Sequence, residues 1–126
     1  MSISPSEKIK VSIEGNIASV MIDNPSANTW DRESLPALKA VVEALNAEPT
    51  VYALVLTGAG EKFFSAGADL NQFASGDADV ARAVGEAFGE AFETLADFRG
   101  VSIAAINGFA MGGGLEVALA CDIRIA

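Results

Sequence analysis

Hydrophobic and polar residues alternate over two short stretches near the start of the chain. Ile9, Val11 and Ile13 are separated by polar residues, and 17–22 is apolar and rich in β-branched residues. Turn-forming residues at 14–16 connect the two stretches, which predicts a β-hairpin. A nearly continuous apolar run at 51–57 predicts a strand covered on both faces. A further apolar run at 101–106 predicts another strand.

Two longer stretches carry apolar residues at helical spacing. The first runs to about Asn46, and Asp31 is its predicted N-cap. The second begins near Asp77 or Asp79 and ends near Phe98. Its predicted buried stripe is Val80, Val84, Phe88, Phe92 and Leu95, and Gly85 and Gly89 are expected to permit close packing. The alternation of strands and helices predicts an α/β fold with parallel strands.

Glycines interrupt the pattern between the strand at 101–106 and a third predicted helix. Gly112, Gly113 and Gly114 precede Glu116 and an apolar run at 117–120, which is typical of a buried helix. Glycines let the backbone approach a ligand, and free N–H groups at a helix start bind negatively charged oxygen. The stretch 63–70 similarly ends an apolar segment in small residues. Two such turns could each direct one N–H at a single carbonyl oxygen, as an oxyanion hole does.

The composition and net charge of the chain exclude some classes of function and disfavour others. The net charge is −9, which disfavours binding to nucleic acid or anionic membranes. The chain has no histidine, which excludes Ser-His-Asp and Cys-His catalysis and argues against a metal site. Carboxylates are therefore the expected proton-transfer groups. Cys121 is the single cysteine, and no stretch is typical of a signal peptide or membrane span, so we expect a cytoplasmic protein.

Two segments in this order, FSAGADL and AAINGFAMGGGLEVALACDIRIA, resemble the crotonase, or enoyl-CoA hydratase/isomerase, superfamily. The resemblance runs from Ile9 to Ala126. It implies an α/β fold, a crotonase-like spiral of repeated ββα units. It also implies that the backbone N–H groups of Ala68 and Gly113 are oxyanion donors and that Glu116 is one of two catalytic glutamates. The substrate-binding residues that it implies are Ala27, Ala66, Ala68, Asp69, Leu70, Gly112 and Gly113.

The resemblance implies an enoyl-CoA hydratase that adds water to trans-2-enoyl-CoA thioesters, as in fatty acid β-oxidation. Coenzyme A is then part of the substrate, and neither a metal nor a separate cofactor is expected. A homotrimer or dimer of trimers is the implied assembly. Two alternatives remain: another reaction on the same fold, such as enoyl-CoA isomerisation, decarboxylation or thioester hydrolysis, and a noncatalytic CoA-binding or assembly protein.

Several of these residues also have purely structural interpretations. A glycine triplet can simply form a tight turn, and Glu116 can be an acid favoured by the start of a helix. We nevertheless expect Glu116 near the interior, where partial burial would suit acid–base work. Asp69 is expected to bond local backbone N–H groups. Cys121 is expected to be a packed small hydrophobe, and Trp30 stands where the family more usually has an aliphatic residue.

The last residues, 121–126, have the pattern of a strand that is just beginning. Members of the resembled family are considerably longer. We therefore expect residues 1–126 to be the N-terminal part of a single crotonase-like domain, with the second catalytic glutamate downstream of Ala126.

Overall fold

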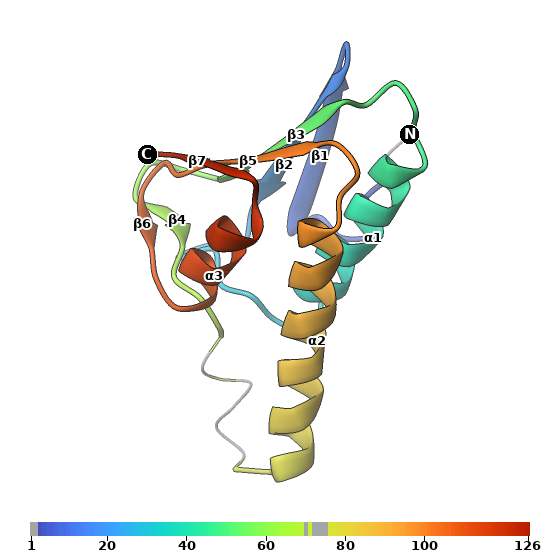
Figure 1. The fold of residues 1–126 in the computed structure, drawn as a ribbon. Coiled ribbons are helices and arrows are strands. Elements are labelled where there is room, and N and C mark those ends of the chain that lie inside the picture. The colour runs from blue at the N-terminus through green and yellow to red at the C-terminus, as the bar shows by residue number, and fades with distance from the viewer. Residues whose placement is uncertain (1–2, 70, 72–75) are drawn as a thin grey trace.

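The computed structural model describes residues 3–69, 71 and 76–126. Its main sheet contains five strands in the order β1-β2-β3-β5-β7 (Figure 1). Their bounds are β1 Ile9–Glu14, β2 Ile17–Ile22, β3 Ala53–Gly58, β5 Val101–Ala105 and β7 Ile123–Ile125. β1 and β2 form an antiparallel hairpin, and the other neighbouring strands pair in parallel. Both features confirm the sequence predictions.

Three helices lie on the same side of this sheet (Figure 1). They are α1 Ser34–Asn46, α2 Ala78–Ala96 and α3 Gly113–Ala120. Leu54, Leu56 and Gly58 of β3 are buried beneath the helical layer, whereas the alternate residues of β3 are only half-buried. The prediction of a strand covered on both faces was therefore wrong for the described residues. The helices cover one face, and side chains of a strand point alternately to the two faces.

A second, two-stranded sheet lies beside α3 and pairs β4 Phe63–Ser65 in parallel with β6 Phe109–Ala110. Phe63 pairs with Phe109, and Ser65 pairs with Ala110. β4 leads into the small-residue turn at 65–69, and β6 leads into the glycine turn at 112–114. The pairing therefore brings the two turns to the same end of one sheet.

Helix α2 begins at Ala78, where the Asp77 carboxylate accepts a hydrogen bond from the N–H of Asp79. This confirms the predicted start of the helix. Gly85 and Gly89 do not permit close packing, because a β carbon at either position would have no neighbouring atom within 4 Å. The sequence interpretation of these two glycines was wrong, and both face open space.

The predicted first helix begins at Ser34 rather than directly after Asp31. The Asp31 carboxylate still accepts hydrogen bonds from the N–H groups of Glu33 and Ser34, at 3.0 and 2.8 Å. In α3, Val117 and Ala118 are buried, as the prediction of a buried helix at 117–120 requires, but Leu119 is exposed, so the prediction holds only in part. No helix in the described ranges has the length and apolar character that crossing a membrane would need.

Candidate functional site

The two small-residue turns touch each other. The N–H of Met111 donates to the carbonyl oxygen of Ser65 at 3.0 Å. Gly67 has a φ of 102°, and a β carbon there would lie 3.1 Å from the amide nitrogen of Gly113. A β carbon on Gly114 would lie 2.0 Å from the carbonyl oxygen of Ser65. Glycine is therefore required at 67 and 114 for the backbones to approach this closely.

Each turn presents an amide without a partner. The hydrogen bonds on either side of Ala68 join Trp30 N–H to the Gly67 carbonyl, at 2.7 Å, and Asp69 N–H to the Trp30 carbonyl, at 2.9 Å. Gly113 is the first residue of α3, where an N–H has no partner within the helix. Within the described part of the chain, neither Ala68 N–H nor Gly113 N–H makes a hydrogen bond. The fold thus brings together two turns that each hold a free donor.

The predicted substrate-binding residues Ala27 and Ala66 lie on adjacent loops, because Ala66 N–H donates to the Ala27 carbonyl at 2.9 Å. Asn28, the next residue, is buried with a φ of 53°. Its side-chain amide donates to the carbonyl oxygens of Ala59 and Phe63, at 3.0 and 3.1 Å. Asn28 therefore fixes the Ala27 loop against the strand that leads to the Ala68 turn. Its positive φ suits asparagine better than most residues.

Glu116 lies in the first turn of α3, and its N–H donates to the Gly112 carbonyl at 3.0 Å. The residue is exposed, so the expectation that it lies near the interior was wrong. It lines a hollow of about 430 Å³ between α2 and α3. The other lining residues are Gly85, Phe88, Gly89, Phe92, Glu93 and Ala96. Because Gly85 and Gly89 lack side chains, α2 leaves space beside the Glu116 carboxylate.

The remaining predicted site residues have varied surroundings. The Asp69 carboxylate accepts a hydrogen bond from the N–H of Asn71 at 3.0 Å, as expected of an acid that holds a turn. Gly112 is exposed with a φ of 52° and immediately precedes α3. Leu70 lies outside the described residues. Cys121 is buried in the core, and this burial raises the pKa of its thiol to about 11.

Sequence reasoning missed two supports of this region. The Ser65 hydroxyl accepts a hydrogen bond from Gly67 N–H at 3.2 Å, so Ser65 contacts both turns. Asp31, next to Trp30, forms a 2.6 Å ion pair with Lys8. Ser65 lies inside the FSAGADL segment and could have been singled out there. The Lys8 pair joins residues 23 positions apart, and no local pattern indicates it.

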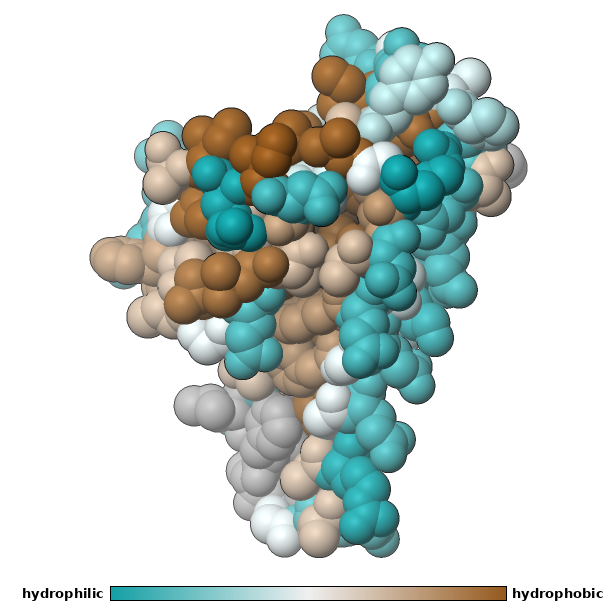
Figure 2. All heavy atoms as spheres, in the orientation of Figure 1, coloured by the Kyte–Doolittle hydropathy of each residue, from teal (hydrophilic) through white to brown (hydrophobic). Residues whose placement is uncertain are grey.

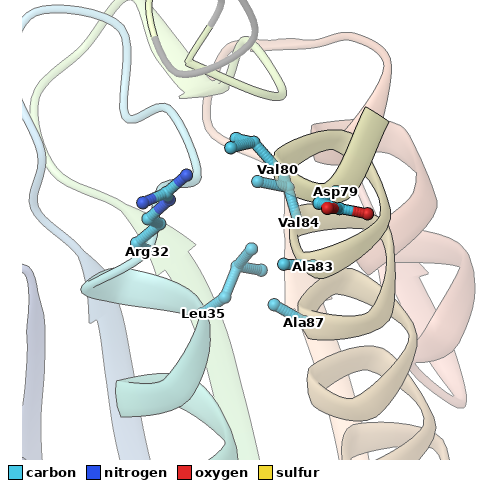
Figure 3. A pocket seen from close by; sticks show the side chains of 7 residues that line it. All are labelled: Arg32, Leu35, Asp79, Val80, Ala83, Val84 and Ala87. Atoms are coloured by element: carbon cyan, nitrogen blue, oxygen red, sulfur yellow. The ribbon is translucent and has the colours of Figure 1, made fainter. Parts of the chain in front are cut away.

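A separate pocket of about 400 Å³ lies between the N-terminal ends of α1 and α2 (Figure 3). Aliphatic side chains from the two helices face each other across it, with Arg32 and Asp79 also in its lining. No residue that the sequence indicated for catalysis or substrate binding lines this pocket. Among the described residues, no group of three or more cysteine or acidic side chains is placed to hold a metal ion.

Comparison with known proteins identifies the family of this chain. Residues 12–126 match the family model for enoyl-CoA hydratase/isomerase. The chain belongs to the enoyl-CoA hydratase/isomerase family. It is 40% identical over 114 residues to a short-chain-enoyl-CoA hydratase of Clostridium acetobutylicum, a match that covers 90% of this chain and 44% of that protein. It is also 39% identical to a crotonyl-CoA hydratase of Syntrophomonas wolfei, with 95% of this chain and 46% of that protein covered.

Solved structures confirm the crotonase-like α/β fold. DspI of Pseudomonas aeruginosa is 63% identical, with a TM-score of 0.94 over 96% of this chain and 50% of that chain. An enoyl-CoA hydratase of Bacillus anthracis is 34% identical, with a TM-score of 0.92 over 95% of this chain and 47% of that chain. The chain therefore spans about half the length of the family members that it matches.

Proposed function

We propose that the full-length protein is an enoyl-CoA hydratase that adds water to trans-2-enoyl-CoA thioesters. The observation that carries this proposal is the contact between two turns whose Ala68 and Gly113 amides have no partner in the described part of the chain. Two such donors stabilise a thioester oxygen as it gains enolate charge, without using any side chain. Loss of one donor in a site of this kind costs on the order of a hundredfold or more in rate.

Glu116 supplies the carboxylate in this proposal. It follows Gly113 by three residues and lines an open hollow, where water and substrate can reach it. Glu116 orients a water molecule and accepts its proton while the oxygen attacks the β-carbon of the substrate. In this proposal a second glutamate, downstream of Ala126, delivers a proton to the α-carbon. The reaction adds one water molecule across the double bond and requires neither a metal nor a redox cofactor.

The acyl-CoA lies along the loops that bracket the two donors. Ala27 and Ala66 are joined by a hydrogen bond, and Asp69 and Gly112 adjoin the donor residues on the two turns. Leu70 belongs to the same proposed set. The net charge of −9 disfavours the approach of coenzyme A, so binding depends on local donors such as these backbone amides.

Other reactions use the same stabilisation of a thioester oxygen, because a fold does not fix its chemistry. Relatives named carnitinyl-CoA dehydratase, from Salmonella arizonae and Proteus mirabilis, are 39% and 37% identical. Dehydration reverses the addition of water and needs the same kinds of group. A carnitinyl-CoA dehydratase is therefore the second candidate activity.

The test is turnover of crotonyl-CoA by the full-length protein. Hydration removes the double bond that is conjugated to the thioester, so the reaction is measured as a fall in ultraviolet absorbance. We expect hydration that saturates with substrate. Binding of crotonyl-CoA without turnover would reject the hydratase proposal and favour a noncatalytic CoA-binding protein. Turnover of carnitinyl-CoA in preference to crotonyl-CoA would favour the second candidate.

A further inference from the structure

Trp30 lies outside the two turns of the candidate site and contacts both of them. Its backbone brackets Ala68, with its N–H donating to the Gly67 carbonyl at 2.7 Å and its carbonyl accepting from Asp69 N–H at 2.9 Å. These two bonds form a parallel β-bridge between Trp30 and Ala68. They fix the peptide planes on either side of Ala68, and the Ala68 N–H itself has no partner among the described residues.

The side chain of the same residue packs against the other turn. The Cδ1 atom of Trp30 lies 3.4 Å from the position of a β carbon on Gly113. Phe88 approaches the same position, with its Cε1 atom at 2.8 Å. Phe92 joins the two rings, with its centroid 5.8 Å from that of Trp30 and 5.5 Å from that of Phe88, both edge to face. The start of α3 thus rests on an aromatic cluster of Trp30, Phe88 and Phe92.

The indole carries a polar atom that core packing alone does not explain. Trp30 is 1% exposed, and its Nε1 is buried without a hydrogen-bond partner in the described structure. Leaving a buried donor unpaired is unfavourable, because the donor loses its hydrogen bond to water. An aliphatic side chain would fill the core without that cost. Nε1 is bonded to Cδ1, so the polar edge of the ring is the edge beside Gly113.

The backbone of Trp30 also has a rigid attachment. The next residue, Asp31, is buried, pairs with Lys8 and accepts hydrogen bonds from the N–H groups of Glu33 and Ser34. The position of Trp30 is therefore set by the start of α1 and by Lys8, which directly precedes β1, and these residues take no part in the two turns.

We propose that Trp30 is a positioning residue that sets the separation and orientation of the Ala68 and Gly113 amides. The inference rests on the proposed function, in which both amides bind the thioester oxygen. Its backbone holds one donor and its indole supports the other, so a smaller side chain lets the start of α3 move relative to the Ala68 turn. Misplacement of a reacting group by about 1 Å can cost a hundredfold in rate.

The test uses the full-length protein with Trp30→Phe and Trp30→Leu, and Phe98→Leu as the matched control. Phe98 is a buried aromatic residue of the same core that touches neither turn in any described contact. Infrared difference spectroscopy of bound butyryl-CoA, which has no double bond to hydrate, reports the thioester carbonyl frequency. Hydrogen bonding to that oxygen lowers the frequency. We expect a lowered frequency in the wild type and Phe98→Leu, and a value closer to free butyryl-CoA in both Trp30 variants.

Kinetics with crotonyl-CoA provide the second measurement. We expect Trp30→Leu to lower kcat by about tenfold to a hundredfold and to change KM by less than about threefold. Trp30→Phe keeps a ring against Phe92, so its loss of kcat should be smaller. If Trp30→Leu does not fold, the carbonyl frequency and kcat of Trp30→Phe decide the question.

Three results would overturn the inference or its basis. An unshifted carbonyl in the wild type means that the donors do not bind the thioester, and the proposed function fails first. A shift present in the wild type and unchanged in folded Trp30 variants leaves the donors in place and rejects the positioning role. An equal loss in Phe98→Leu shows general loosening of the core and also rejects it.

Discussion

Glu116 is an exposed residue one helical turn after Gly113, whose amide has no partner among the described residues, and it lines a hollow together with Phe88 and Phe92. At the scale of single residues, this arrangement separates charge stabilisation from proton transfer. The amides of Ala68 and Gly113 belong to the backbone, and only proline, which also fixes φ, would remove either N–H. The Glu116 carboxylate can be removed by substitution while both amides stay in place. Substitution of Glu116 is therefore the most direct single-residue test of the mechanism.

We predict that Glu116→Gln in the full-length protein lowers kcat for crotonyl-CoA hydration by about a hundredfold or more. The amide is nearly isosteric but cannot accept the proton of water. Binding of butyryl-CoA, measured by calorimetry, should change little. Glu93→Gln is the matched control, because Glu93 lines the same hollow from α2. A Glu116→Gln variant that keeps most of its turnover would show that Glu116 is only a helix-start charge.

A second prediction concerns Asp31, which anchors the backbone next to Trp30. Burial alone would raise the pKa of the Asp31 carboxyl. The Lys8 ammonium and the N–H groups of Ser34 and Glu33 outweigh burial, so this pKa lies below its usual value. The unfolded chain therefore takes up the proton at higher pH than the folded protein does. The resulting stability is fully present above the unfolded pKa of about 3.9 and is lost as pH falls toward the folded pKa.

Asp31→Asn should accordingly lower the denaturation midpoint of the full-length protein at pH 7. The midpoint of the variant should also decrease less than that of the wild type as the pH is lowered. We expect a loss of about 1–3 kcal/mol, since the hydrogen bonds from the Glu33 and Ser34 N–H groups and a partly buried ion pair are both weakened. Denaturant midpoints measured from neutral pH to about pH 3 test this. Asp23→Asn is the control, because Asp23 pairs with the exposed Lys10 and such surface pairs contribute little. Equal effects of the two substitutions would contradict the prediction.

At the scale of elements, the site depends on how closely α3 approaches β4. The carbonyl of Ser65, at the end of β4, occupies the space where a side chain of Gly114 would lie. α2 shows the opposite situation, because its glycines face open space and weaken a helix without a packing reason. Replacing glycine by alanine should therefore have opposite effects on stability in α3 and in α2.

We predict that Gly114→Ala destabilises the full-length protein strongly and reduces hydration, because α3 and the Gly113 amide must move away from β4. Gly89→Ala should raise the stability by about 0.5–1 kcal/mol through helix propensity. Thermal unfolding of both variants under the same conditions is the measurement. Similar unfolding midpoints for the two variants would show that the approach of α3 to β4 is not tightly constrained.

At the scale of the whole molecule, apolar side chains remain at the surface. Exposed large hydrophobic residues cluster on β5, β7, β6 and α3, and Ile125 is 57% exposed. Figure 2 shows apolar atoms gathered over this end of the molecule, whereas hydrophilic atoms follow α2. The residues concerned are Val101, Phe109, Met111, Leu115, Leu119, Ile123 and Ile125. Surfaces of this kind are usually covered by other protein.

We predict that a polypeptide of residues 1–126 alone self-associates or aggregates, because its exposed strand β7 and the surrounding apolar side chains have no cover. The full-length protein should instead sediment as a defined trimer or dimer of trimers. Sedimentation velocity at micromolar concentration tests both samples, with crotonyl-CoA hydration assayed in parallel. A soluble, monomeric 1–126 polypeptide with turnover near the full-length rate would also reject the two-glutamate mechanism.

The sequence alone determined the parts of this protein that depend on local pattern. The hairpin at 9–22, the start of α2 at Asp77 and the two small-residue turns follow from residue spacing and turn chemistry. The order of the two segments also predicted the family to which the chain belongs. These features can be predicted because hydrophobic periodicity and glycine determine the structure of the backbone only a few residues away.

Only the tertiary structure decided which surfaces are covered and which distant residues meet. The exposure of Glu116, the open space at Gly85 and Gly89 and the half-buried face of β3 all depend on where neighbouring elements lie. The contact of Trp30 with both turns joins three separate segments of the chain. Burial and long-range contact are properties of the packed molecule, because they arise from surfaces that no local stretch of sequence contains.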